Sequence, residues 1–443
     1  MMSLPGSGVA NDFAQLRQRV QEAGLLKSRP LYYVWQVMWC VSLLASVFVI
    51  LVLTNSLWVR LLDAVLLAFA GGQIALLGHD AGHRQIRSTT GTVILYLAAF
   101  CTGISAMCWQ VVHNAHHAHP NRDEMDPDIE QPLFAYSEEQ VLLRKWRVAQ
   151  FTIRHQEYLY FPLLMFTGWS LRKTGMEFLR ERNFRETWLD WMSFALHFAL
   201  YFIILFALLP PLQAVFFIVV HQMSWGLYLG SIFAPNHKGM DMVDKNQKID
   251  FLREQVLTAR NVRPGFFTDI FYGGLNYQIE HHLFPAMPRC NLGRARVFVR
   301  EHCAKLGVSY HETSIPRSYV EILSHMRSVA QFARNHKTQH AALMWQARGE
   351  LRSSVLSSVS AARAELTTAT AAFVQSRLSD AQKAHVSQLH QEAVFKLDNI
   401  REAVSRSAHM KRAKLLQYQK EVAKTVEEWK SRWAVATGSM VTV

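Results

Sequence analysis

The chain has 443 residues, half of them hydrophobic, and a formal net charge of +13. Between Arg29 and Arg60 there is no Lys, Arg, Asp or Glu, and this run exceeds the roughly 20 apolar residues that cross a bilayer. We therefore expect a membrane protein and not a set of soluble domains. No zinc-finger spacing or aromatic-basic RNA motif accompanies the positive charge, so we expect no nucleic-acid partner and attribute the charge to cytosolic loops.

The amino-terminal segment and the cysteines bear on the compartment. Residues 1–30 contain an amphipathic stretch, with Phe13, Leu16 and Val20 at helical spacing, and no pattern of a removable signal peptide. We expect this segment on the cytosolic side. The cysteines are scattered and lack a CxxC pair, which argues against both a disulfide framework and a thiolate metal site. They are Cys40, Cys101, Cys108, Cys290 and Cys303.

Apolar runs predict four membrane spans in two hairpins. The dipeptide Asn55-Ser56 separates the spans of the first pair, and Pro210-Pro211 separates those of the second. Each pair returns the chain to the side that it left. The spans are expected at about residues 32–54, 61–78, 191–209 and 212–234.

Residues 92–112 are uncharged and nearly long enough to form another span. If they crossed the membrane, His79 and His83 would face the opposite compartment from His113 and the histidines that follow it. One shared metal site would then be impossible. We therefore predict an interfacial or re-entrant segment with a break at Gly103, buried by protein.

Histidines gather in three short stretches at helical spacing. Residues three and four apart lie on one face of a helix, so each stretch can direct its imidazoles to one point. His237 follows the last predicted span and emerges on the same face. For His197 and His221, which lie inside the second pair of spans, we expect a structural role. The stretches are His79-Asp-Ala-Gly-His83, His113-Asn-Ala-His116-His117 and Gln278-Ile-Glu-His281-His282.

Residues 120–132 are acidic and rich in turn-forming residues. Our main expectation is a solvated loop. The alternative is that some of its carboxylates accept a hydrogen bond from the second ring nitrogen of a metal-bound imidazole. The acidic residues are Asp123, Glu124, Asp126, Asp128 and Glu130.

Lys and Arg dominate residues 144–185, where the alternation from Leu171 to Arg185 predicts a helix on the membrane surface. Arg144, Lys145 and Arg172 have two equal interpretations. They could attract a phosphate-bearing head group, or they could simply follow the positive charge of cytosolic loops.

The remaining chain divides into a cap and a tail. Residues 238 to about 330 are polar and form a cytosolic helical cap that would bring His281 and His282 to the other histidines. The tail carries a net charge of +7 and apolar residues at helical intervals. We expect long amphipathic helices attached to the membrane surface or to a partner, without a coiled-coil register. The predicted domains are residues 1–30, 31–334 and 335–443.

Eight histidines are more than one metal ion can use. Catalytic zinc, for example, takes three protein ligands and water. Two metal ions account for the number better, and neutral nitrogen donors without cysteine indicate a redox metal, iron, that reacts with dioxygen. The two hairpins could guide an acyl chain to the metals. The predicted ligands are His79, His83, His113, His116, His117, His237, His281 and His282.

The motifs HDAGH, HNAHH and GGLNYQIEHHLFPAMPR, together with four spans in two hairpins, resemble the membrane-bound fatty acid desaturases over about Tyr32 to Leu306. Gln278 stands where many relatives have His, as in the branch that includes front-end desaturases. The resemblance implies an all-α integral membrane protein with a di-iron centre on the cytosolic face. It further implies that dioxygen and two electrons remove two hydrogens from an acyl chain, leaving a cis double bond and water. Gln278 and Asn236 become candidates for a weak or water-mediated ligand.

Two departures from the family concern partners. No His-Pro-Gly-Gly haem motif occurs, so the resemblance implies a separate electron donor, such as a ferredoxin, a cytochrome or a reductase. The basic tail has no recognised counterpart; we interpret it as a solvated appendage, with docking of the electron donor as the alternative.

Three alternatives for function stay open. A di-iron lipid hydroxylase would use the same oxidant, whereas a zinc-dependent lipid hydrolase or a zinc receptor would not use dioxygen. The substrate is expected to be an acyl-CoA or a membrane lipid.

Overall fold

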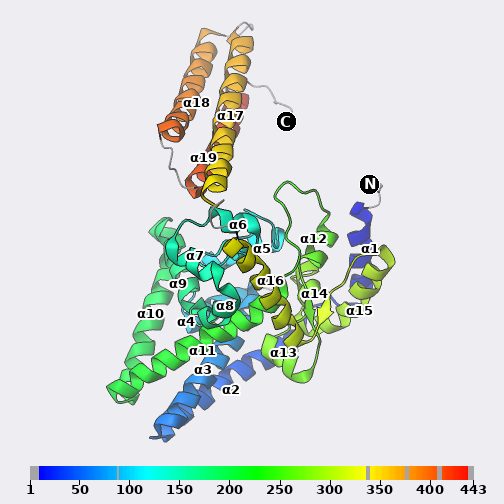
Figure 1. Cartoon of the computed structure of the whole chain (residues 1–443), viewed down its shortest axis with the longest axis vertical. Helices are drawn as coiled ribbons and strands as arrows, with labels where there is room; N and C mark the ends of the chain where they lie inside the picture. Colours follow the sequence, from blue (N-terminus) through cyan, green and yellow to red (C-terminus); the bar gives the residue numbers. More distant parts are fainter. Residues whose placement is uncertain (1–8, 87–88, 336–339, 375–378, 407–411, 438–443) are drawn as a thin grey trace. The chain divides into compact units, whose positions relative to one another are not determined.

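The computed structural model describes residues 9–86, 89–335, 340–374, 379–406 and 412–437 (Figure 1). The chain divides into two compact units, Met1–Asn335 and His336–Val443. In chain order the first unit contains α1 (Val9–Glu22), α2 (Pro30–Leu53), α3 (Leu57–Gly82), α4 (Thr89–Thr102), α5 (Ala106–Ala118), η1 (Pro127–Ile129), α6 (Glu138–Leu143), α7 (Arg147–Arg154), α8 (Gln156–Leu164), α9 (Thr167–Arg180), α10 (Phe184–Leu208), α11 (Pro211–His237), α12 (Phe251–Leu257), β1 (Asn261–Val262), α13 (Phe266–Tyr272), α14 (Gln278–Leu283), α15 (Arg289–Leu306), β2 (Glu312–Thr313) and α16 (Ile315–Asn335).

Four of the described helices, α2, α3, α10 and α11, are long and apolar enough to cross a membrane. They have 24 to 27 residues, which corresponds to about 36–40 Å at the rise of an α-helix. α2 and α10 expose many apolar side chains, as expected for surfaces that contact lipid, whereas α3 and α11 are about half buried. The predicted spans therefore exist as helices, although all four are longer than predicted, α2 by a single residue. α3 continues to Gly82 and α11 to His237, so His79 and His237 lie within the last helical turns.

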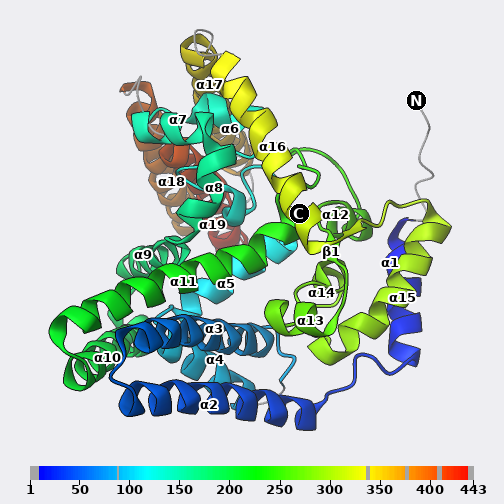
Figure 2. The same ribbon diagram turned by 60° about the horizontal axis from the view of Figure 1, so that its bottom comes forward.

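Close packing of α3 against its neighbours organises the apolar helices. α3 contacts α2, α4 and α11 (Figure 2). Glycines permit the short approach: a Cβ atom on Gly72 would lie 2.0 Å from the Tyr228 ring, and one on Gly78 would lie 2.6 Å from Ala98 Cβ. Because these distances are shorter than any real contact, larger residues here would push the helices apart.

The segment at residues 92–112 is broken as predicted. α4 and α5 meet at an angle of 107°, and Gly103 between them has a φ of +65°. Ser105 caps α5 by accepting a hydrogen bond from Cys108 N and donates its own hydroxyl to the buried Asp190 of α10. Arg172 of α9 donates to Thr102 O at 2.8 Å and to Gly103 O at 3.2 Å. Buried polar partners therefore satisfy the backbone where the helix stops.

The structure corrects the prediction of one helix over residues 171–185 and excludes one of the two interpretations of Arg172. The surface helix is divided, because α9 ends at Arg180 and α10 begins at Phe184. Arg172 is 3% exposed and also donates to Gln222 Oε1. Its guanidinium lies 4.6 Å from the centre of the Trp225 ring. It therefore cannot present its charge to a phosphate head group. The structural role expected for His221 is supported by Tyr201, whose hydroxyl donates to His221 Nδ1 at 2.7 Å.

The cap is built from α12 to α16 and a single short parallel pair, in which β1 pairs with β2. This pair is a minor exception to the expected all-α fold. α1 belongs to the cap as well: Leu16, Val20 and Leu25 are fully buried in a hydrophobic core with residues of α12, α14 and α15. The amphipathic face near the amino terminus thus packs against protein.

The second unit contains α17 (His340–Val374), α18 (Asp380–Arg406) and α19 (Arg412–Thr437), which pack against one another. Their apolar faces form a shared core that includes Val359, Leu397 and Trp429. This differs from our expectation that these faces attach to a membrane or a partner. Charged pairs cross the outside of the bundle, for example Lys430 with Glu365 at 2.8 Å.

Gly103→Ala should destabilise the first unit. A left-handed backbone costs a non-glycine residue about 1–2 kcal/mol, and the new Cβ atom would lie 2.5 Å from His197 Cδ2. We expect a lower midpoint of thermal unfolding in detergent solution, followed by tryptophan fluorescence. Gly349→Ala is the matched control, because nothing lies within 4 Å of the position where its Cβ would be placed and alanine favours a helix interior. Equal midpoints for the two variants would contradict this account of the break.

Candidate metal centre

The three histidine motifs lie on three helix ends. His79 is in the last turn of α3 and His83 caps that helix, α5 carries the central motif, and α14 carries His281 and His282. His237 is the last residue of α11. The structure brings all eight predicted histidines together in two groups, in each of which the possible ligand atoms lie within 4.8 Å of one another.

Five histidines form the larger group: His79, His83, His113, His117 and His281. Their Nε2 atoms converge. His113 Nε2 lies 3.2 Å from His79 Nε2 and 2.9 Å from His83 Nε2, and His117 Nε2 lies 3.1 Å from His281 Nε2. Two nitrogens each about 2.1 Å from one metal ion, at a right angle, lie about 3 Å apart. These separations therefore fit ligands of a single ion.

The smaller group consists of His116, His237 and His282. His237 Nε2 lies 3.2 Å from His116 Nε2 and 3.0 Å from His282 Nε2. The Gln278 amide nitrogen lies 2.9 Å from His237 Nε2. The amide oxygen of Gln278 is buried and has no hydrogen-bond partner among the described residues. Because the two ends of an amide are exchanged by a flip, Gln278 can present its oxygen at the same point.

Asn236 is buried beside His237, and its Oδ1 atom also lacks a hydrogen-bond partner within the described part of the chain. Its backbone oxygen accepts a hydrogen bond from Arg260 N. An unsatisfied buried oxygen is costly unless water or an ion completes it. Asn236 and Gln278 thus both retain the capacity for the weak or water-mediated contact that was expected of them.

Oxygen atoms orient the three rings of the smaller group through Nδ1. His237 Nδ1 lies 2.9 Å from Thr258 O, and His282 Nδ1 lies 2.8 Å from Gln255 Oε1. His116 Nδ1 lies 3.0 Å from both oxygens of Asp126. A proton on each Nδ1 leaves the lone pair on Nε2, which is the arrangement that metal ligation requires.

The prediction of a solvated acidic loop is wrong for Asp126, which is fully buried. Its carboxylate also accepts hydrogen bonds from Asn121 N at 2.8 Å and Asp128 N at 2.9 Å. Burial opposes ionisation, but the His116 imidazole lowers the pKa of this carboxyl below its ordinary value. The alternative interpretation, a carboxylate that orients an imidazole, is the one that the geometry supports.

Trp109 forms one wall of the larger group. Its ring stacks on the His113 ring at a centroid distance of 4.6 Å. Gly82, inside the first motif, makes room for it, because a Cβ atom there would lie 2.2 Å from Trp109 Cζ3. The glycine of HDAGH therefore serves packing of the site.

The surroundings of His281 and His282 favour the neutral form of both rings. Burial, reinforced by the neighbouring imidazoles, lowers the pKa of both rings well below the ordinary value. Neutral imidazole is the form that binds a metal ion. Nitrogen donors without cysteine suit a transition metal, and the two groups can hold one ion each.

Sequence reasoning missed the residues that position His237. Asn121 Nδ2 donates to His237 O at 2.9 Å, and Arg260 donates to Pro235 O and Lys238 O. Arg260 in turn pairs with Glu321 at 2.7 Å. A proline inside α11 was one available signal, since it frees a carbonyl one turn earlier and loosens the helix end.

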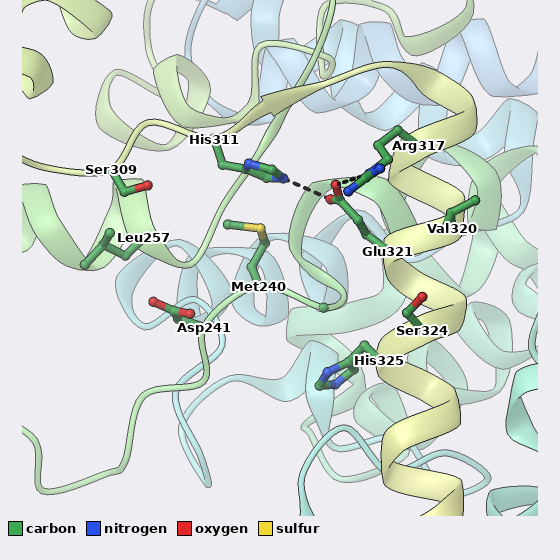
Figure 3. Close-up of a pocket in the computed structure, with 11 residues that line it drawn as sticks. Met240, Asp241, Leu257, Ser309, His311, Arg317, Val320, Glu321, Ser324 and His325 are labelled. Carbon is green, nitrogen blue, oxygen red and sulfur yellow. Dashed lines mark hydrogen bonds and ion pairs between the residues drawn. The ribbon is translucent and has the colours of Figure 1, made fainter.

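Glu321 also borders a cavity of about 650 Å³ on the cap (Figure 3). It accepts hydrogen bonds from His311 Nε2 at 2.9 Å and from Arg317 Nε at 3.3 Å (Figure 3). The described lining residues include none of the eight histidines. This cavity is therefore separate from the histidine cluster. Glu321, which lines it, pairs with Arg260, and Arg260 donates hydrogen bonds to backbone oxygens at the end of α11.

Apolar helices of membrane-spanning length that end in a buried histidine cluster define a helical membrane protein with a metal-binding site. The sequence pattern described as "Fatty acid desaturase" matches residues 56–314. The chain belongs to this family, and it is an oxidoreductase that desaturates fatty acyl chains.

Three relatives illustrate the similarity. The Delta(6)-fatty-acid desaturase fat-3 of Caenorhabditis elegans is 34% identical over 344 residues, which cover 73% of this chain and 76% of that protein. The Delta(8)-fatty-acid desaturase of Helianthus annuus is 30% identical over 347 residues, covering 74% and 75%. The Acyl-lipid (9-3)-desaturase of Physcomitrium patens is 29% identical over 351 residues, covering 76% of this chain and 65% of the moss protein.

Asp126→Asn should weaken the smaller group. The amide removes the charge that stabilises the Nδ1 proton of His116, and loss of such a partner typically costs about 10–100-fold in metal affinity or activity. We expect less metal per chain by elemental analysis and a lower desaturation rate. Asp128→Asn is the control, because that side chain is about half exposed and its carboxylate lies 3.7 Å from His116 Nδ1. Equal losses in both variants would argue against a specific role of Asp126.

Proposed function

We propose that this desaturase holds two iron ions, one in each histidine group. His79, His83, His113, His117 and His281 hold the first; His116, His237 and His282 hold the second, with Gln278 and Asn236 available for a weak or water-mediated contact. The observation that carries the proposal is the convergence of eight Nε2 atoms in two groups with spacings that fit common metal ligands. The residues present fit nitrogen-ligated iron.

The iron pair, when bound, supplies the chemistry by which dioxygen, two electrons and two protons remove two hydrogens from an acyl chain and yield a cis double bond and two waters. The protein's own residues prepare this site. Thr258, Gln255 and Asp126 keep three rings in one tautomer. Burial of His79, His116, His237, His281 and His282 limits the access of bulk water to the site, which limits side reactions of the oxidant.

We further propose two transmembrane hairpins, α2 with α3 and α10 with α11, with the cap, the active site and both termini on the cytosolic face. The short connections within each pair, residues 54–56 and 209–210, contain no Lys or Arg, whereas the long segments outside the pairs contain many, and this distribution supports the arrangement. The corresponding segments are residues 1–30, whose helix α1 packs into the cap, residues 31–334 and residues 335–443. The last is the basic helical tail, which we treat as a solvated appendage.

The electrons come from a separate protein, a ferredoxin, a cytochrome or a reductase. The substrate is a fatty acyl chain carried by CoA or by a membrane lipid. One relative is named an acyl-lipid desaturase, which favours the lipid carrier for this chain as well.

The metal assignment predicts about two irons per chain in purified protein. His117→Ala removes a nitrogen from the larger group and should abolish desaturation in cells and lower the iron content. His385→Ala is the matched control, since His385 is an exposed residue of α18. Zinc in place of iron, turnover without oxygen, or full activity of His117→Ala would refute the proposal.

Expression in a host with a simple lipid profile should produce new acyl chains that are lighter by two hydrogens. Mass spectrometry of the intact lipids and of the acyl-CoA pool identifies the carrier and locates the double bond. Products that are instead heavier by one oxygen would identify a hydroxylase, which the same kind of metal site could support.

A further inference from the structure

α13 presents two large apolar side chains to the outside of the first unit. Phe266 is 74% exposed and Phe267 is 83% exposed. They follow Arg263, Pro264 and Gly265, which are also exposed. The other end of the helix is anchored, because Tyr272 is fully buried in a core with Leu76 of α3. A short helix fixed at one end and bare of protein contacts at its aromatic end needs an apolar environment to cover it.

Hydrogen bonds from two side chains of the apolar helices show at what height along those helices α13 lies. Gln73 Nε2 of α3 donates to Ile270 O at 2.9 Å, and the Tyr228 hydroxyl of α11 donates to Phe271 O at 2.8 Å. Gln73 precedes His79 by six residues and Tyr228 precedes His237 by nine. At 1.5 Å per residue these contacts lie about 9 Å and 14 Å from the histidines, toward the middle of the helices. α13 therefore lies beside the membrane-spanning helices, on the membrane side of the metal centre.

The start of α2 independently indicates the position of α13 along the apolar helices. Its first turn packs beside the part of α3 that α13 contacts, because Tyr33 shares a buried cluster with Ile74 and Leu77. α2 begins at Pro30, where the long uncharged run starts. The uncharged run of the chain thus begins beside α13. Figure 2 shows α13 near the amino-terminal end of α2 and the carboxy-terminal end of α3.

We propose that α13 lies in the membrane interface and inserts Phe266 and Phe267 among the lipid acyl chains. Arg263, three residues before Phe266, is placed to hold its charge at the level of the lipid phosphates. The occupant of this surface is the bilayer, because α13 is hydrogen-bonded to α3 and α11, two of the helices long and apolar enough to cross it. The proposal depends on those helices crossing a membrane and not on the identity of the metal.

This contact ties the third histidine motif to the bilayer. Only residues 273–277 separate α13 from α14. Asp269 of α13 accepts hydrogen bonds from Asn276 Nδ2 at 2.8 Å and from the Tyr277 hydroxyl at 3.2 Å. α13 and the start of α14 therefore move as one piece. The depth of α13 in the lipid consequently helps to set where His281 and His282 sit relative to the membrane.

The test uses photocrosslinking of the full-length protein in phosphatidylcholine nanodiscs. Benzoylphenylalanine replaces Phe267 in one variant and Phe266 in a second, and ultraviolet irradiation is followed by mass spectrometry of the intact protein. We expect lipid adducts at both positions, with fragments that place the new bond on an acyl chain. Replacement of an exposed phenylalanine by a larger aromatic residue leaves the core unchanged.

Phe251 and Phe202 provide the matched controls. Phe251 is 44% exposed on α12, which Figure 1 shows on the far side of the cap from α13; we expect several-fold less lipid adduct there. Phe202 is 42% exposed on α10 and should form adducts as a membrane-spanning position. The proposal is overturned if Phe202 yields lipid adducts while Phe266 and Phe267 yield no more than Phe251, or yield bonds to the head group alone.

Discussion

The crowding of eight imidazoles, five of them buried and three half-buried, is the constraint on which this structure depends. Each buried ring carries two nitrogens, and a buried polar atom without a partner is costly. In the smaller group, oxygen atoms of Asp126, Thr258 and Gln255 accept hydrogen bonds from the Nδ1 atoms of its three rings, which offsets this cost. In the larger group the Nδ1 atoms of His117 and His281 have no hydrogen-bond partner among the described residues, and His79 Nδ1 lies 3.5 Å from Asp80 Oδ1. Packing, including contact of the His79 ring with Trp109, therefore contributes more to holding these rings. The proposed metal ions, when bound, would satisfy the Nε2 atoms of both groups.

The apolar helices are shaped to deliver the histidines to one place. α3 and α11 lie against each other through glycines that admit aromatic rings, and their last turns carry His79 and His237. The turn at Gly103 directs α5 back toward them, and buried polar side chains of α9 and α10 satisfy that turn. The break is therefore a structural requirement of the site.

Sequence reasoning succeeded where the signal is local. Apolar runs predicted the four long helices, and the spacing of the histidines on single helices predicted which side chains converge. It failed where a partner comes from elsewhere in the chain. From the sequence, Asp126 cannot be distinguished from the other acidic residues of its loop, because its contact with His116 is formed only in the fold. No local pattern identifies Gln255 and Thr258 as partners of histidines either. The burial of Arg172 was not predicted for a related reason. Its guanidinium donates to Thr102 O and Gly103 O, which are free to accept only because the helix ends there, some 70 residues earlier in the chain. In the tail, the amphipathic pattern specified apolar faces but not that they would cover one another.

Gln255 joins the two histidine groups although its own helix contributes no ligand. Its amide oxygen accepts from His282 Nδ1, and its amide nitrogen donates to the backbone oxygen of His117 at 3.2 Å. One planar amide thus fixes a ring of the smaller group and the backbone of the larger one. Any replacement at position 255 therefore acts on both groups at once, and the effects of substitutions in the second and third motifs are not expected to be additive.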